Sequence, residues 1–111
     1  MTKTTVRYEN KRQWQTYTLK CLGHAGYAKE GEDIVCAAVS TLCYTLYNYI
    51  RKLEVEILFK TDEEKGFMYL SVTNYGPMNL KAVYAFEMAQ AGLETIAENY
   101  PLNVSCEVEV I

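Results

Sequence analysis

The sequence is poor in the features that mark several common functional classes. Its longest uncharged stretch runs from Ile34 to Ile50, which is shorter than the ~20 apolar residues that a membrane-spanning helix needs. The 111 residues carry a formal net charge of −3, and the basic side chains are scattered rather than clustered. We therefore expect no membrane segment and no direct nucleic-acid binding.

Metal centres and disulfide frameworks are not indicated either. The chain has four cysteines, but no two of them have C-x-x-C spacing, which disfavours zinc and thioredoxin-type chemistry. The first residues lack the apolar core of a secretion signal. We expect a cytoplasmic protein without a metal or other cofactor, in which the thiols stay reduced: Cys21, Cys36, Cys43 and Cys106.

Alternating apolar residues predict two β-hairpins and a final strand. The chain has only two prolines and no repeat or linker, so one domain over residues 1–111 is expected. Residues 6–8 and 14–19 are rich in β-branched and aromatic side chains and form the first hairpin. Residues 53–60 and 66–74 form the second, around an acidic turn at 62–65, and residues 104–110 alternate again.

Three- and four-residue spacing predicts two helices. The first covers residues 34–51 after the capping residue Asp33, with its apolar stripe at Ile34, Ala38, Thr41, Leu42, Thr45 and Tyr49. Pro77 opens the second and Pro101 ends it, with a stripe at Val83, Phe86, Ala89, Leu93 and Ile96 or Ala97. The order ββαββαβ predicts an α+β domain, in which two helices pack on one face of a mixed or antiparallel sheet.

A histidine and a cysteine lie at positions that suit nucleophilic catalysis. His24 is the single histidine and belongs to the loop Gly23-His24-Ala25-Gly26, and Cys36 follows in the first turn of the predicted helix. A helix N-terminus stabilises a thiolate and can lower its pKa from ~8.5 into the range of roughly 3.5–7.5. We expect His24 to act as the base, and the free N–H groups of the first helical turn to bind an oxyanion.

Each of these residues also has a plain structural interpretation. A cysteine on a helix is most often a small buried hydrophobe, and a lone loop histidine is often a hydrogen-bonded turn residue. The other three thiols are expected to be buried or half-buried. The acidic segment 62–64 is interpreted as a solvated turn. Spacing alone therefore does not decide whether Cys36 and His24 are catalytic.

The segment Gly23 to Ser40, GHAGYAKEGEDIVCAAVS, favours catalysis. It resembles the signature of the ribosomal-processing cysteine protease family of Firmicutes and related bacteria. That signature has a Gly-His-Ala element, a short loop, and then Gly-x-Asp-Ile-Val-Cys-Ala-Ala-Val-Ser. The likeness extends more loosely through Phe86, Gly92-Leu93 and residues 97–101, and so covers nearly the whole chain.

The resemblance implies a cysteine endopeptidase. Family members remove an N-terminal extension from large-subunit ribosomal protein twenty-seven, cutting after an aromatic residue, and they look like homodimers. Carried over to this sequence, the likeness implies His24 and Cys36 as the catalytic pair, a homodimer, and no cofactor.

Further positions of the motif are matched by four residues, which we expect to support the site: Gly23, Gly31, Asp33 and Ser40. The glycines permit tight turns, and Ser40, one turn after Cys36, steadies the site. Asp33 either caps the helix or orients His24, which are competing uses of one carboxylate. Residues 27–30 are expected to be mobile alone and to order over a bound peptide.

Two alternatives belong to other functional classes. In the first, the Gly-His-Ala-Gly loop and the helix N-terminus form a non-enzymatic module that binds an anion or a ribosomal surface. Stable binding of the extended ribosomal protein without cleavage would identify such a module. In the second, Cys36 is a thiol redox sensor with Cys43 as its nearest partner in sequence, which peroxide titration and mass measurement would reveal.

Overall fold

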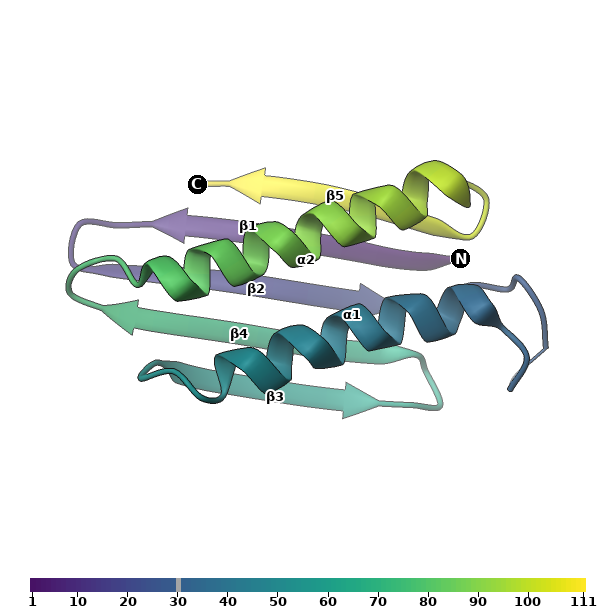
Figure 1. Cartoon of the computed structure of the whole chain (residues 1–111), viewed down its shortest axis with the longest axis horizontal. Helices are drawn as coiled ribbons and strands as arrows, with labels where there is room; N and C mark the ends of the chain where they lie inside the picture. Colours follow the sequence, from purple (N-terminus) through teal and green to yellow (C-terminus); the bar gives the residue numbers. More distant parts are fainter. Residues whose placement is uncertain (30) are drawn as a thin grey trace.

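The computed structural model describes residues 1–29 and 31–111; Glu30, part of the segment expected to order over a peptide, lies outside the described residues. The chain forms β1 (Thr2–Asn10), β2 (Trp14–Leu22), α1 (Ile34–Ile50), β3 (Glu56–Asp62), β4 (Phe67–Tyr75), α2 (Leu80–Asn99) and β5 (Val104–Val110) (Figure 1). This order confirms the predicted α+β arrangement. No helix within the described ranges is long and apolar enough to cross a membrane.

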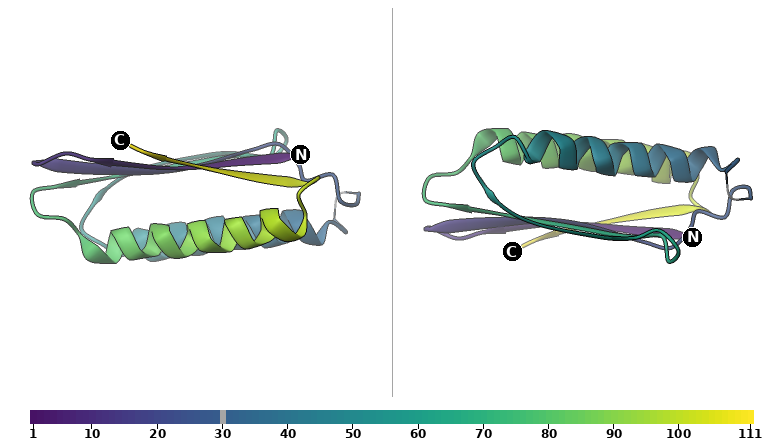
Figure 2. Two further views of the ribbon diagram at one scale, coloured as in Figure 1. Left: turned by 90° about the horizontal axis from the view of Figure 1, so that it is seen from above. Right: turned by 90° about the horizontal axis from the view of Figure 1, so that it is seen from below.

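One mixed sheet carries the whole domain. Its strand order is β3-β4-β2-β1-β5, with β1 and β5 parallel and the other neighbours antiparallel. Both helices lie on the same face of the sheet, as Figure 2 shows. The largest side chains of the core come from the middle strands and from both helices, including Tyr17, Leu19, Ile50, Leu70, Phe86 and Leu93. This core fixes the ends of β2 and α1 relative to each other.

The first helix begins where predicted, but the predicted apolar face is wrong. Five residues of α1 are buried: Val35, Val39, Cys43, Leu46 and Ile50. Ile34 and Tyr49, which belong to the predicted stripe, are 59% and 44% exposed. Both sets of positions have the three- and four-residue spacing of a helix, and both contain apolar side chains. Spacing alone therefore predicted the helix but not which face meets the sheet.

The second helix starts later than predicted. Asn79, not Pro77, is its cap, and the Asn79 side chain accepts a hydrogen bond from the Ala82 N–H at 3.2 Å. Its buried residues are Ala82, Phe86, Ala89 and Leu93, which confirms most of the predicted stripe. The helix ends before Pro101, as expected. The alternation predicted for residues 104–110 does not produce one buried face in β5: Val104 is buried, whereas Val110 is 73% exposed at the sheet edge.

Candidate active site

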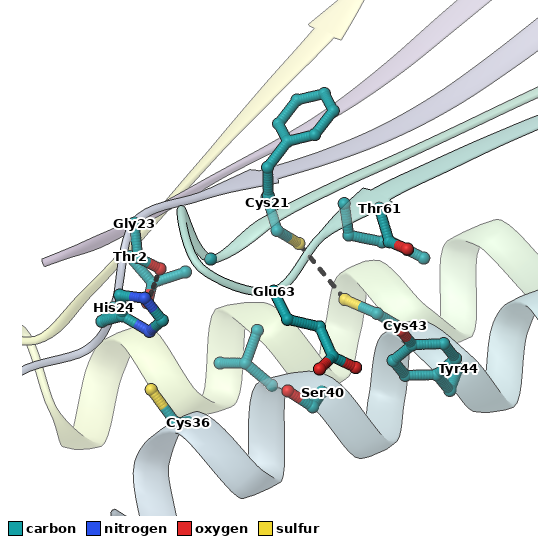
Figure 3. A pocket seen from close by; sticks show the side chains of 14 residues that line it. Thr2, Cys21, Gly23, His24, Cys36, Ser40, Cys43, Tyr44, Thr61 and Glu63 are labelled. Atoms are coloured by element: carbon teal, nitrogen blue, oxygen red, sulfur yellow. Dashed lines mark hydrogen bonds between the residues drawn. The ribbon is translucent and has the colours of Figure 1, made fainter. Parts of the chain in front are cut away.

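His24 and Cys36 come together at one end of the sheet. His24 lies in the loop that leaves β2, and Cys36 lies in the first turn of α1. Both line a hollow of about 220 Å³, and Figure 3 shows the Cys36 sulfur pointing toward the His24 imidazole. His24 is exposed and Cys36 is half-buried, so both can be reached by a substrate.

The turn between β3 and β4 holds the imidazole. His24 Nε2 lies 2.9 Å from the carbonyl oxygen of Glu64 and donates to it, because a carbonyl only accepts. In the neutral ring this leaves Nδ1 as the unprotonated nitrogen, available as a base. The Gly23 N–H donates to the Gly66 carbonyl at 3.1 Å, which joins the histidine loop to the same turn.

Gly66 leaves room for this contact. A Cβ at Gly66 would lie 2.8 Å from the Gly23 carbonyl and 3.3 Å from His24 Cε1, and the Gly66 φ of +61° also favours glycine. The acidic segment interpreted as a solvated turn is therefore part of the site. Sequence reasoning missed Glu64 and Gly66 because no local pattern links residue 24 to a turn 40 residues away.

One backbone group contacts the thiol, and two distant residues hold the loop that carries it. The Ala25 N–H donates to Cys36 Sγ at 3.2 Å. Asn103, in the turn between α2 and β5, donates from Nδ2 to the Ala25 carbonyl at 3.0 Å. Thr2 donates from its hydroxyl to the Gly23 carbonyl at 2.9 Å. No sequence pattern pointed to Thr2 or Asn103, because they reach the loop only through the folded sheet.

Asp33 acts as a cap rather than as an orienter of His24. Its Oδ1 accepts from the Val35 and Cys36 N–H groups at 3.0 and 2.9 Å, and its Oδ2 accepts from the Tyr27 and Ala28 N–H groups at 3.0 and 3.3 Å. Partial desolvation raises the pKa of Asp33, but these four hydrogen bonds outweigh it and hold the pKa below its ordinary value.

The expectation that first-turn N–H groups bind an oxyanion is wrong for most of that turn. Val35 and Cys36 donate to the Asp33 carboxylate, and Ala37 donates to the Asp33 carbonyl at 3.1 Å. A capping carboxylate satisfies the donors that a bare helix N-terminus would offer to an anion. Because these N–H groups already donate to Asp33, the main physical support for an anion-binding module is removed.

The other supporting residues surround two hollows that share the His24–Cys36 pair. A second hollow, of about 440 Å³, is lined by Gly31 and Asp33 among others, and Ser40 lines both hollows. Gly23 has a φ of +96°, and a Cβ there would overlap the Met1 carbonyl. Both hollows border Cys36, so each offers room for part of a peptide beside the thiol.

The remaining thiols are packed rather than exposed. Cys21 and Cys43 are buried with their sulfurs 3.2 Å apart, and this hydrogen bond together with burial raises the pKa of Cys21. Burial also raises the pKa of half-buried Cys106. Seven residues along a helix span about 10 Å, more than the ~7 Å between Cα atoms that a disulfide tolerates. Cys43 therefore cannot pair with Cys36 while α1 is intact, which weakens the redox-sensor alternative.

Sequence comparison relates the whole chain to a family of peptidases. The model of the family described as Cysteine protease Prp matches residues 1–105. The Ribosomal processing cysteine protease Prp of Bacillus subtilis is 27% identical, over the full length of both chains. The protein of the same name from Mycoplasma pneumoniae is 30% identical, over 82% of this chain and 86% of that one.

Solved structures have the same fold. The protease Prp from S. aureus, in complex with a covalently linked product peptide, superposes with a TM-score of 0.77 at 25% identity, covering 95% of this chain and 98% of that one. The protein SMU.848 from Streptococcus mutans superposes with a TM-score of 0.73 at 28% identity, covering 100% and 96% of the two chains.

Proposed function

Since the chain belongs to the cysteine protease Prp family, we propose that Cys36 is the nucleophile and His24 the general base of its peptide hydrolysis. One observation carries this assignment. The Cys36 sulfur points toward the only imidazole of the chain, at the boundary of two open hollows (Figure 3). The covalent product complex of the S. aureus relative supports an enzyme-bound intermediate in this family.

The reaction follows from this geometry. His24 takes the thiol proton, and Sγ attacks the carbonyl carbon of the peptide bond. The carbonyl oxygen becomes an oxyanion, and the intermediate collapses to a thioester as His24 returns the proton to the leaving amine. Water then attacks the thioester with His24 again as base, which releases the new carboxylate and the free thiol. The Glu64 carbonyl keeps the imidazole in the required tautomer and orientation.

The proposed substrate is the N-terminal extension of large-subunit ribosomal protein twenty-seven, in the cytoplasm. The relatives in B. subtilis and M. pneumoniae are named for ribosomal processing. The hollow beside Cys36 includes the apolar side chains of Val39, Tyr44, Phe67 and Met68, which suit an aromatic residue before the cut. Burying one aromatic side chain is worth roughly 1.5–3 kcal/mol, or about ten- to a hundredfold in selectivity.

A peptide series tests this assignment. Peptides that carry an aromatic residue before the scissile bond should be cleaved, and replacing that residue with Ala should lower kcat/KM by about ten- to a hundredfold. Replacement with another aromatic residue should be tolerated. Equal rates across the series would remove the ribosomal-precursor assignment. Binding of the peptide by wild-type protein without any cleavage would instead favour a non-enzymatic module.

A further inference from the structure

The reaction needs a hydrogen-bond donor for the oxyanion, and the expected donors are occupied. Val35, Cys36 and Ala37 donate to Asp33. Ile34, the remaining residue of the first turn, is not among the described residues that line either hollow. One backbone donor does contact the reacting atom: the Ala25 N–H lies 3.2 Å from Cys36 Sγ.

We propose that the Ala25 main-chain N–H stabilises negative charge at the reacting centre, first on the Cys36 thiolate and then on the oxyanion, and that Asn103 is its positioning residue. The proposal rests on the proposed peptidase function. As the Sγ–carbon bond forms, the electron pair of the carbonyl double bond moves onto oxygen, beside the sulfur. The charge thus moves from the sulfur to the oxygen on the carbon that the sulfur attacks, and we assign the same fixed N–H as its donor there.

The surrounding contacts make this donor rigid before substrate arrives. Ala25 is only 2% exposed, and its carbonyl accepts from Asn103 Nδ2 at 3.0 Å. Asn103 is itself fixed, because its carbonyl accepts from the Thr2 N–H at 2.8 Å and its N–H donates to the Tyr100 carbonyl at 2.9 Å. Donors held in place before the reaction need no reorganisation when the charge develops.

Deacylation separates the two roles of the Ala25 N–H. Once Sγ is acylated, no thiolate is present until the bond between sulfur and carbon breaks. Water adds to the thioester before that step, and the addition limits the rate because thiolate leaves more readily than hydroxide. A donor that serves only the thiolate therefore has little effect on the rate of deacylation. The p-nitrophenyl ester of N-acetylphenylalanine is a suitable probe, because nitrophenolate release reports acylation of Cys36 and loss of the acyl mass reports deacylation.

Replacing Ala25 by lactic acid removes this N–H and leaves the side chain unchanged. We expect deacylation to slow by about a hundredfold, the range for loss of one oxyanion donor, and iodoacetamide alkylation of Cys36 to slow as well. The same ester substitution at exposed Ala91 of α2 should leave both rates unchanged. Deacylation within twofold of wild type would overturn the proposal, whereas failure of the wild-type protein to acylate would overturn the peptidase function itself.

Asn103→Ala provides a second route if the lactic acid variant does not fold. It should slow deacylation about tenfold or more while leaving KM for a cleaved peptide near the wild-type value, because it moves a donor rather than the peptide-binding surface. Asn99→Ala is the matched control, since the exposed Asn99 makes a similar bond from Nδ2, to the Thr95 carbonyl at 2.8 Å. Unchanged deacylation in folded Asn103→Ala would contradict the positioning role.

Discussion

A glycine at the site is needed for a different reason from a glycine elsewhere in the chain. Gly66 and Gly76 both have a positive φ, of +61° and +87°, and so carry a similar backbone cost when replaced. They differ in their surroundings. A Cβ at Gly66 would press on Gly23 and approach His24, whereas a Cβ at Gly76 would meet nothing within 4 Å.

Gly66→Ala should therefore lower kcat by more than its loss of folding stability explains. Each variant is expected to lose about 1–2 kcal/mol of unfolding free energy, the cost of a left-handed backbone for a residue with a Cβ. Gly66→Ala should lose more than Gly76→Ala, because its Cβ would lie 2.8 Å from the Gly23 backbone. Only Gly66→Ala should lower kcat, by about tenfold or more, because His24 is displaced from the thiol. Denaturant unfolding and peptide cleavage measure the two effects. Equal kcat in the two variants would contradict the role given to the β3–β4 turn.

Asp33 makes the stability of the first turn depend on pH. Its folded pKa is lowered, so its contribution is present above the ordinary carboxyl pKa of about 3.9 and is lost as pH falls through the folded value. Asp33→Asn keeps the shape without the charge, and is expected to be less stable than wild type at pH 7 by about 1 kcal/mol. The unfolding free energies of wild type and Asp33→Asn, measured from pH 7 to pH 2, should become equal at the acid end of the range. A difference in unfolding free energy between the two proteins that stays constant over this pH range would argue against the four charge-assisted hydrogen bonds.

Among the helices and strands, the sequence was informative about order and type but not about every contact. Alternation in β4 and the Asp33 cap predicted their elements because both signals are local. The buried face of α1 was misassigned because apolar side chains occur all around that helix. The histidine–cysteine pair could be predicted from one short segment, whereas Glu64 and Asn103 reach that segment only through tertiary contacts 40 and 78 residues apart in sequence.

Neighbouring substitutions on α1 test which face packs on the sheet. Leu46 is 4% exposed, and Leu46→Ala should cost about 2–5 kcal/mol through the cavity that it leaves. Thr45, part of the predicted stripe, is exposed, and Thr45→Ala should change stability by less than about 0.5 kcal/mol. Chemical denaturation of both variants provides the comparison. A larger loss for Thr45→Ala than for Leu46→Ala would restore the face predicted from spacing.

In the molecule as a whole, four separate segments assemble the site at one end of an elongated domain. The domain measures 45 × 22 × 18 Å. Figure 1 shows the N-terminus, the start of α1 and the β3–β4 turn at the same end of the long axis, with the α2–β5 turn beside them. The hydrogen bonds of Thr2, Glu64 and Asn103 join these segments to the loop of His24. Catalysis is therefore expected to be lost as soon as this end of the sheet frays.

The family likeness also leads us to propose a homodimer. Light scattering should then give about twice the 12.7 kDa mass of one chain at micromolar concentration. A mass of one chain at concentrations where the protein is active would contradict this assignment. It would leave the peptidase mechanism intact, because every group used in that mechanism belongs to a single chain.

The most direct measurement of the central claim is the intact mass of an extended ribosomal protein twenty-seven after incubation with this protein. Wild type should convert the precursor into two products separated at a bond that follows an aromatic residue. Cys36→Ala should fold with an unchanged circular dichroism spectrum and leave the precursor whole, and Cys106→Ala should cleave as wild type does. Substantial cleavage by folded Cys36→Ala would contradict the assignment of Cys36 as the nucleophile.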